Sequence, residues 1–560
     1  MAGPNPATDF SVALLGEFIR RGVRDIVLCP GSRSQALALA AAAYEEAGRV
    51  RLRVRIDERS AGFLALGLAV ETRTPVILAT TSGTAVANLH PAALEAHHSG
   101  VPLILLTADR PPELRGIGSN QTTDQLGIFG SAVGWLREVE APSETGFDPD
   151  YPGELAHEAY AAAAGHSSRP GPVQLNLAFR EPLSGPVGRL PELKTHAWPD
   201  APPRRVLHLE SAPGTVVIAG SGAGPEAEAL ASSLGVPLLA EVSSGSRFGP
   251  NLVVAYRELL RDPEFGGRVR RAIVFGHPTL SREIPQLLQR PDVETHVIMS
   301  SAAEAYNPGR RATSFSDAAV RVGDRDDSAS ARAWTGRWVQ ASRRLLDRGL
   351  ETTEPAPAGT GADRPGAFAR EQLAAFREPV TRRMLVESVW RSSWPHDRLV
   401  FGASRLIRVA DGILPGKRIP AHANRGLAGI DGTIATAIGI ALASQAGTGT
   451  AGVTRVLLGD LATLHDVGSL LFGTGEPRPR IQVIVGNDGG GTIFDGLEVA
   501  DTAPSTAFDR VLYTPQSVDL GKLAEAYGWG HRLAANRGQL DEALSVTAGQ
   551  TIIEVPLPRA

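Results

Sequence analysis

Two polar segments that follow apolar runs have the residue types and the spacing needed to bind a metal ion and a diphosphate. Gly459-Asp460 follows Val456–Leu458, and Asn487-Asp488-Gly489 follows Ile481–Val485. The interval between them accommodates a crossover helix, so both segments are expected at the carboxyl edge of one parallel sheet, where open α/β folds bind ligands. A carboxylate, an amide oxygen and a glycine carbonyl suit Mg²⁺, which leaves positions for phosphate oxygens and water. The pattern predicts a metal-bridged diphosphate anchor; the alternative is that Asp460 only caps a helix and Asn487 only forms a turn.

A second signal is Glu58, in the segment Arg55-Ile56-Asp57-Glu58-Arg59 before a stretch rich in Ala, Gly and Leu. A carboxyl group at the end of a strand and next to such a helix is expected to be partly buried. Burial raises the pKa of a carboxyl group and favours a hydrogen bond from it to a ring nitrogen. Thiamine diphosphate needs such a group at N1′ of its aminopyrimidine ring. The alternative is a surface ion pair between Asp57 or Glu58 and a neighbouring arginine, but together with the anchor Glu58 points to thiamine diphosphate.

These residues can lie close together only if the strands that precede them end at a common sheet edge. Apolar runs that could form such strands occur in three successive groups along the chain. Continuous β-branched runs that alternate with helical stretches indicate parallel sheets covered on both faces. The fold class is therefore α/β, with three consecutive doubly wound domains: residues 1–183, 184–350 and 379–560, with 351–378 as a linker of proline-rich composition. The expected strands are Asp25–Cys29, Val76–Thr80, Leu103–Thr107, Val216–Ala219, Ala272–Phe275, Val297–Met299, Leu399–Phe401, Val456–Leu458, Ile481–Val485 and Ile552–Val555.

The bulk composition favours a multidomain globular protein and disfavours nucleic acid or a membrane as its main partner. The 560 residues are 42% hydrophobic and 21% charged, with a net charge of −4 and no long charged block. Cys29 is the only cysteine, so no intrachain disulfide is possible, which fits the cytoplasm. The uncharged stretch Gly432–Thr454 is rich in Gly, Ala and Thr, and we expect a buried helix followed by a loop there rather than a membrane span.

The anchor and Glu58 together resemble the thiamine-diphosphate decarboxylase and carboligase superfamily. Within it, several further motifs resemble one family, the menaquinone-pathway synthases that make 2-succinyl-5-enolpyruvyl-6-hydroxy-3-cyclohexene-1-carboxylate (the MenD family). These motifs are Cys29-Pro30-Gly31-Ser32-Arg33-Ser34, Asp57-Glu58-Arg59, Thr81-Ser82-Gly83-Thr84-Ala85-Val86-Ala87-Asn88, Thr107-Ala108-Asp109-Arg110-Pro111-Pro112-Glu113-Leu114, Asn120-Gln121, Asn424-Arg425-Gly426 and Gly429-Ile430-Asp431-Gly432. The resemblance covers all three domains and implies a pyrimidine-binding domain, a central domain and a diphosphate-binding domain, in that order.

The resemblance also implies which residues form the site. The catalytic residues would be Glu58, Arg33, Gln121 and Arg408. Contacts with substrate would come from Ser32, Arg33, Arg110, Gln121, Arg282, Ser404, Arg408, Arg425 and Phe494. The cofactor would lie against Pro30, Glu58, Ser82, Gly83, Ser404, Gly429, Ile430, Gly459, Asp460, Leu461, Asn487 and Ile493, and the metal ligands would be Asp460, Asn487 and Gly489. Two further glycines follow Gly489, so Gly489 is a less firm assignment than Asp460.

The implied reaction is the decarboxylation of 2-oxoglutarate on thiamine diphosphate and addition of the resulting carbanion to isochorismate. Both substrates are dicarboxylates, which agrees with the arginines that occupy loops after expected strands. Mg²⁺ is the implied metal and Mn²⁺ the alternative. The implied assembly is a homodimer or homotetramer with sites between subunits. The alternatives are another thiamine-dependent 2-oxo acid decarboxylase, an acetolactate-synthase-like enzyme, or a catalytically silent α/β protein.

The central segment Gly220-Ser221-Gly222-Ala223-Gly224 resembles a nucleotide-binding loop after a strand. It lacks the full dinucleotide-binding spacing, so a tight strand-to-helix turn is favoured over flavin binding.

Overall fold

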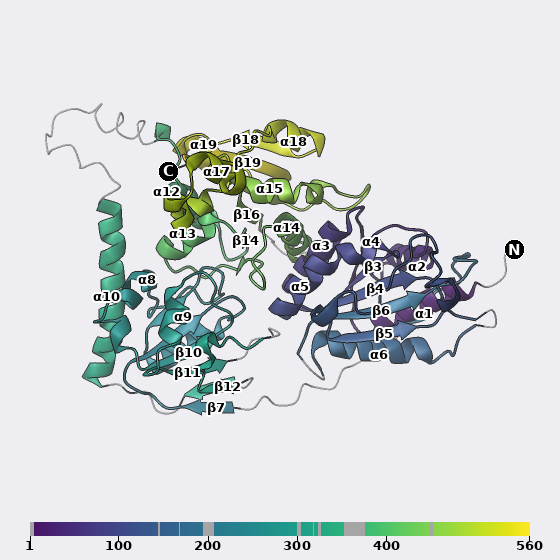
Figure 1. Ribbon diagram of the computed structural model, residues 1–560, viewed down its shortest axis with the longest axis horizontal. Helices are drawn as coiled ribbons and strands as arrows, with labels where there is room; N and C mark the ends of the chain where they lie inside the picture. The colour runs from purple at the N-terminus through teal and green to yellow at the C-terminus, as the bar shows by residue number, and fades with distance from the viewer. Residues whose placement is uncertain are drawn as a thin grey trace.

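The computed structural model describes residues 5–559 except 144–145, 167–168, 194–205, 299–303, 317–318, 323–325, 327, 352–375 and 448–451. Three parallel sheets follow one another along the chain, each with helices packed against it (Figure 1). This confirms the predicted fold class. Most of the predicted linker, and Met299 of one predicted strand, lie outside the described residues, and the domain boundaries stay a prediction.

The first sheet has six strands in the order β2-β1-β3-β4-β6-β5. Alternate residues of its strands belong to two different hydrophobic cores: Val27 and Leu78 lie in one, Ile26 and Ile77 in the other. Both faces of the sheet are therefore buried, as its unbroken apolar strands predict. The strands are β1 (Asp25–Leu28), β2 (Arg51–Val54), β3 (Val76–Thr80), β4 (Leu103–Asp109), β5 (Trp135–Val139) and β6 (Pro172–Ala178). The helices are α1 (Pro6–Arg20), α2 (Gln35–Glu46), α3 (Glu58–Thr72), α4 (Thr84–Asn88), α5 (His90–Ser99) and α6 (Tyr151–Ala164).

The second sheet, of five strands, has the order β12-β11-β10-β8-β9, and a separate pair joins β13 to β7. Its strands are β8 (Thr215–Ala219), β9 (Leu238–Ala240), β10 (Arg271–Phe275), β11 (Glu294–Ile298) and β12 (Ser314–Ser316), and the pair is β7 (Val206–Leu209) and β13 (Ala319–Val322). The helices are α7 (Glu226–Leu234), α8 (Tyr256–Arg261), α9 (Glu283–Leu288) and the long α10 (Ala329–Glu351).

The third sheet, of six strands, has the order β15-β14-β16-β17-β19-β18. Its strands are β14 (Arg398–Phe401), β15 (Ala421–His422), β16 (Thr454–Gly459), β17 (Ile481–Asn487), β18 (Gly530–Leu533) and β19 (Gln550–Pro556). The helices are α12 (Arg382–Ser392), α13 (Arg405–Ile413), α14 (Thr433–Ser444), α15 (Asp460–His465), α16 (Glu498–Thr502), α17 (Ser505–Phe508), α18 (Leu520–Ala526) and α19 (Arg537–Ser545). The uncharged stretch predicted to be a buried helix is α14, and among the described residues no helix is long and apolar enough to cross a membrane.

Helices α3 and α14 pack side by side and join the first and third units (Figure 1). Two glycines allow this close approach: a Cβ at Gly67 would lie 2.0 Å from the carbonyl oxygen of Thr436, and one at Gly439 would lie 2.3 Å from that of Leu64. The residues around them form a single hydrophobic core that includes Phe63 and Ile438. The two units that carry Glu58 and Asp460 thus share one core.

We expect Gly67→Ala to lower the thermal unfolding midpoint, because the added methyl group must push the two backbones apart. Overpacking of this kind costs about 1–3 kcal/mol. Gly336→Ala in α10 is the matched control, since a Cβ there meets nothing within 4 Å and the change should stabilise the helix by about 0.5–1 kcal/mol. Thermal unfolding followed by circular dichroism measures both. Equal midpoints for the two variants would contradict the expected clash.

Candidate active site

Asp460 and Asn487 lie at the carboxyl ends of neighbouring strands. β16 and β17 pair in parallel with Gly459 opposite Gly486, so the residues that follow emerge at the same edge of the sheet. Asp460 begins α15 and is buried; its Oδ1 accepts a hydrogen bond from the backbone N–H of Leu461 at 2.9 Å. Its Oδ2 is buried with no hydrogen-bond partner among the described residues. Burial raises the pKa of Asp460 to about 6, and nearby Asp488 adds to the rise.

A buried carboxylate oxygen without a donor is costly, and a bound cation would remove that cost. Asn487 Oδ1 accepts from the Gly489 N–H at 3.2 Å, and Asn487 Nδ2 donates to Glu554 Oε1 at 2.8 Å. The amide oxygen of Asn487 is thereby fixed toward the Gly489 turn. Among the described residues no group of three or more His, Cys, Asp or Glu side chains could hold a metal, so a metal here would depend on one carboxylate, neutral oxygens and the phosphates. The residues present fit Mg²⁺ with a diphosphate.

Gly489 adopts a φ of +75°, and its carbonyl oxygen already accepts a hydrogen bond from the backbone N–H of Gln516 at 3.2 Å. A carbonyl oxygen has a second lone pair, so metal ligation is compatible with this contact. It leaves Gly489 a weaker candidate than Asp460.

Glu58 is the first residue of α3, and the preceding Asp57 caps the helix by accepting from the backbone N–H groups of Arg59 and Ser60. The Glu58 side chain is half-buried, and its Oε2 accepts from Asn88 Nδ2 at 3.5 Å. Burial raises the pKa of the Cys29 thiol, and the charge of Glu58 is the next largest cause. Glu58 therefore lies beside Cys29, close to the predicted cofactor residue Pro30.

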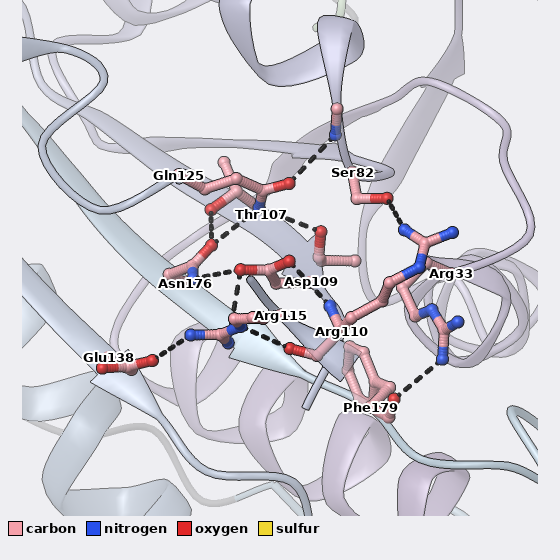
Figure 2. Close-up of polar contacts among 12 residues, drawn as sticks. Arg33, Ser82, Thr107, Asp109, Arg110, Arg115, Gln125, Glu138, Asn176 and Phe179 are labelled. Atoms are coloured by element: carbon pink, nitrogen blue, oxygen red, sulfur yellow. Dashed lines mark hydrogen bonds and ion pairs between the residues drawn. The ribbon is translucent and has the colours of Figure 1, made fainter. Parts of the chain in front are cut away.

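Two predicted substrate arginines, Arg33 and Arg110, lie together at the carboxyl edge of the first sheet (Figure 2). Arg33 Nη1 donates to the carbonyl of Phe179 at 3.0 Å. Arg110 Nη1 donates to Ser82 Oγ at 2.8 Å and to the carbonyl oxygen of Gln121, and Gln121 Nε2 donates to the carbonyl of Ser82 at 2.8 Å. Burial, followed by the charge of Arg110, lowers the pKa of Arg33. Two buried cations this close attract an anion.

A polar network that the sequence analysis did not identify holds the backbone of Arg110 through Asp109 (Figure 2). Asp109 Oδ1 accepts from the Arg110 backbone N–H at 2.7 Å, and Asp109 Oδ2 accepts from Asn176 Nδ2 at 2.9 Å. Gln125 donates to Asn176 and accepts from the Gly83 N–H at 3.0 Å. The motifs that contain Asp109-Arg110 and Gly83 were the sequence signals near this network; Gln125 and Asn176 lie outside them.

The other predicted substrate arginines form a second group, between the central and third units. Burial lowers the pKa of Arg408, and the neighbouring charges of Arg425, Arg257 and Arg282 lower it further. Ser404 caps α13, and Arg408 Nη1 donates to its carbonyl at 3.2 Å. Arg282 is exposed and pairs with Glu498 at 3.3 Å. Arg257 pairs with Asp411 and Arg282 with Glu498, whereas Arg408 has no carboxylate partner among the described residues, so it suits a ligand that carries a carboxylate.

The remaining predicted residues lie near these groups with differing exposure. Pro30 and Ser32 are exposed, Ile493 and Phe494 are half-buried in the turn after Gly491, and Ile430 is 40% exposed. The predicted residues form two sets: Arg33, Arg110 and Glu58 in the first unit, and Arg282, Arg408, Arg425 and Asp460 in the central and third units. Among the described residues, no hydrogen bond or ion pair joins the two sets. One chain thus holds two separate groups of predicted site residues, which we call half-sites.

A cavity of about 1550 Å³ lies where the three units meet, but of the predicted site residues only Arg425 lines it. The central glycine-rich loop forms part of its wall. Ser221 and His277 exchange backbone hydrogen bonds of 3.0 and 2.8 Å, and a Cβ at Gly220 would lie 2.1 Å from Pro278 N. These contacts agree with the tight turn favoured from the sequence.

Comparisons with known proteins are consistent with this geometry. Residues 11–128 match the family model for the N-terminal TPP-binding domain of thiamine pyrophosphate enzymes. The 2-succinyl-5-enolpyruvyl-6-hydroxy-3-cyclohexene-1-carboxylate synthase of Leifsonia xyli subsp. xyli is 61% identical over 99% of this chain and 97% of its own length; that of Clavibacter michiganensis subsp. michiganensis is 58% identical over the same shares. The crystal structure of benzoylformate decarboxylase from Polynucleobacter necessarius superposes with a TM-score of 0.66 at 16% identity, covering 100% of this chain and 99% of that one. At that identity the likeness establishes the fold alone.

Proposed function

The chain belongs to the 2-succinyl-5-enolpyruvyl-6-hydroxy-3-cyclohexene-1-carboxylate synthase family of thiamine-diphosphate enzymes, and from this premise we propose how its residues perform the synthase reaction. The reaction decarboxylates 2-oxoglutarate and joins the remaining four-carbon unit to isochorismate, with release of CO2. We assign it to menaquinone biosynthesis in the cytoplasm, where the free, buried Cys29 is compatible with a reducing environment.

Asp460 and Asn487 would hold Mg²⁺, or Mn²⁺ as the alternative, and through it the diphosphate, with the Gly489 carbonyl as a third ligand. The observation that supports this is the orphaned, buried Oδ2 of Asp460. Glu58 would hold a proton against N1′ of the aminopyrimidine ring. When bound, thiamine diphosphate supplies a thiazolium ring that accepts the electron pair left by departing CO2.

The arginines would orient the two dicarboxylates. The observation that supports this is electrostatic: the charges of Arg425 and Arg282 act on Arg408, and the charge of Arg110 acts on Arg33. Among the described residues Arg408 has no carboxylate partner and its neighbouring arginines disfavour its charge, so a substrate carboxylate would be stabilised beside it. Fixing the remote carboxylate leaves the reacting one in a poorly solvated region, which favours loss of CO2.

We further propose that the site is completed by a second copy of the chain. Large apolar side chains are exposed beside both half-sites: Ile56 (72%) near Glu58, and Leu427 (53%) and Ile430 (40%) in the third unit. Apolar side chains in such positions mark an interface, and a two-fold axis would bring Glu58 of one copy toward Asp460 of the other. Light scattering should give a mass of twice the chain, or four times for a tetramer; a monomer that is fully active would contradict this.

Product analysis tests the function as a whole. With thiamine diphosphate and Mg²⁺, 2-oxoglutarate and isochorismate together should give the synthase product and CO2. A 2-oxo acid decarboxylase acting alone would instead release an aldehyde, and an acetolactate-synthase-like enzyme would consume pyruvate. Either of these outcomes, without synthase product, would overturn the proposal.

Arg408→Ala is expected to raise the KM of one dicarboxylate by roughly 10- to 100-fold, the effect of losing one charge-assisted hydrogen bond. Its exposed side chain makes no ion pair with a carboxylate among the described residues and contributes little to the fold, so the unfolding midpoint should change little. Arg268→Ala is the control, because Arg268 is exposed and pairs only with Glu264 four residues away. Steady-state kinetics with each substrate varied in turn provide the measurement. Unchanged KM values for both substrates would contradict a role for Arg408 in substrate binding.

A further inference from the structure

Glu95 is a buried carboxylate that connects the first unit to a loop of the third. It lies on α5 and is 4% exposed. Its Oε1 accepts from the backbone N–H of Gly426 at 2.7 Å and from Ser99 Oγ at 3.0 Å, and its Oε2 accepts from the backbone N–H of Leu427 at 2.8 Å. Both oxygens therefore fix backbone atoms of the two residues that follow Arg425.

The loop at Gly426 is pressed directly against α5. A Cβ at Gly426 would lie 2.8 Å from Ser99 Oγ, 2.9 Å from the carbonyl of Glu95 and 3.0 Å from His98 Cβ. Only a glycine fits this contact without displacing the loop. The loop is thus held by steric contact and by two hydrogen bonds to a charged group, which are stronger than bonds between neutral groups.

The side chain of Arg425 is held from the opposite direction by the central unit. Arg425 Nε donates to Thr279 Oγ1 at 2.8 Å, and Nη2 donates to the carbonyl of Thr279 at 3.3 Å. Thr279 is fixed in turn, because its backbone N–H donates to the buried Glu241 Oε1 at 2.7 Å. The position of the Arg425 guanidinium group therefore depends on side chains of two other units. Glu95 binds the backbone that follows Arg425, and Glu241 binds the backbone N–H of Thr279, the residue that Arg425 contacts.

We propose that Glu95 is a positioning residue that sets Arg425 for binding a substrate carboxylate. The proposal rests on the proposed function, in which Arg425 contacts substrate. Glu95 acts through the backbone of Gly426 and Leu427 and does not itself touch the substrate. Its carboxylate form is essential to this role, since each oxygen accepts a backbone N–H, whereas a glutamine would present an NH2 group to one of these donors.

The test is a double-mutant cycle with Glu95→Gln and Arg425→Ala, in which kcat/KM is measured separately for 2-oxoglutarate and isochorismate. Arg425→Ala identifies the substrate that Arg425 holds. Glu95→Gln should lower kcat/KM for that same substrate by about tenfold, with kcat nearly unchanged. In the Arg425→Ala background it should cause no further loss. Amide hydrogen exchange at Gly426 and Leu427 should become faster in Glu95→Gln.

Glu71→Gln is the matched control. Glu71 also bridges the first and third units, accepting from Arg398 Nη2 at 2.6 Å and Nε at 2.9 Å, and its Oε2 lies 3.8 Å from His422 Nε2 at the end of β15. Among the described residues it has no hydrogen bond to Arg425, Gly426 or Leu427. It should lower the unfolding midpoint without changing kcat/KM for either substrate. If Glu95→Gln does not fold, Gly426→Ala, which displaces the loop from α5, should produce the same selective loss.

A Glu95→Gln enzyme with both kcat/KM values unchanged overturns the positioning role, as does a further loss in the Arg425→Ala background. An Arg425→Ala enzyme with both values unchanged overturns the substrate contact of Arg425 instead. Absence of synthase product from the wild-type enzyme would overturn the proposed function itself. The three failures are therefore distinguishable.

Discussion

Replacement of Glu58 with glutamine is expected to lower turnover by about 10²- to 10⁴-fold, the range attributed to a positioned acid–base group. Glutamine keeps the shape of the side chain, and Asp57 still caps α3. It cannot, however, hold and return a proton at a ring nitrogen. Binding of Mg²⁺ and of the diphosphate end of the cofactor should change little, because the groups proposed to hold them, Asp460, Asn487 and Gly489, lie on the third unit. The loss should therefore be in kcat.

Two measurements separate these effects: product formation at saturating substrate, and a fluorescence titration of the apoenzyme with thiamine diphosphate in the presence of Mg²⁺. Glu46→Gln is the control, since Glu46 is an exposed carboxylate at the end of α2 in the same unit. It should leave both quantities unchanged. Normal product formation by Glu58→Gln would contradict the role assigned to Glu58.

Asp460→Asn is expected to produce two effects of opposite sign. It should weaken Mg²⁺-dependent cofactor binding by at least about tenfold, because a neutral amide replaces the only carboxylate among the proposed ligands. It should also stabilise the apoenzyme, because the wild-type protein buries a carboxylate oxygen that has no hydrogen-bond partner within the described part of the chain. The pKa of Asp460 is about 6 against an ordinary 3.8, which limits this gain to ~3 kcal/mol near neutral pH.

The stability of the apoenzyme should depend on pH in a direction set by the raised pKa of Asp460. Between pH 6 and 4 the folded apoenzyme takes up a proton at Asp460 that the unfolded chain does not, so this group stabilises the fold at low pH and the effect is lost as pH rises through 6. Asp460→Asn should remove that dependence. The control is Asp397→Asn: Asp397 is also buried, but it accepts from Arg455 at 2.9 Å and from the backbone of Val453 and Trp394. That variant should lose stability, and a gain in both variants would contradict the argument for Asp460.

The sequence was sufficient to predict the central apolar strands of the three sheets and the residues at their carboxyl ends. Runs such as Ile481–Val485 are continuous and apolar because both faces of the sheet are covered, and Asp460 and Asn487 then follow from strand order. Other strands were not predicted: β5 is largely exposed at the sheet edge, β15 has two residues, and β6 is buried throughout but its apolar run is interrupted by Gln174 and Asn176. None of these carries the continuous apolar run by which the predicted strands were found.

The supporting polar groups could not be predicted for a different reason. Glu95 and Glu241 acquire their roles from Gly426 and Thr279, which are remote in sequence and belong to other units. A lone glutamate in an alanine-rich helix carries no local sign of its partner. The proposed meeting of the two half-sites requires a second chain, whose placement does not follow from residue spacing.

The helix pair α3 and α14 bears on how such an enzyme can be recombined. Because the residues around Gly67 and Gly439 interlock across one apolar interior, a chimaera that takes its N-terminal third from one parent and its C-terminal third from another would mismatch this seam and aggregate. Grafts limited to the middle third leave the seam intact. Laboratory shuffling should accordingly recover parental combinations of the two outer thirds far more often than chance.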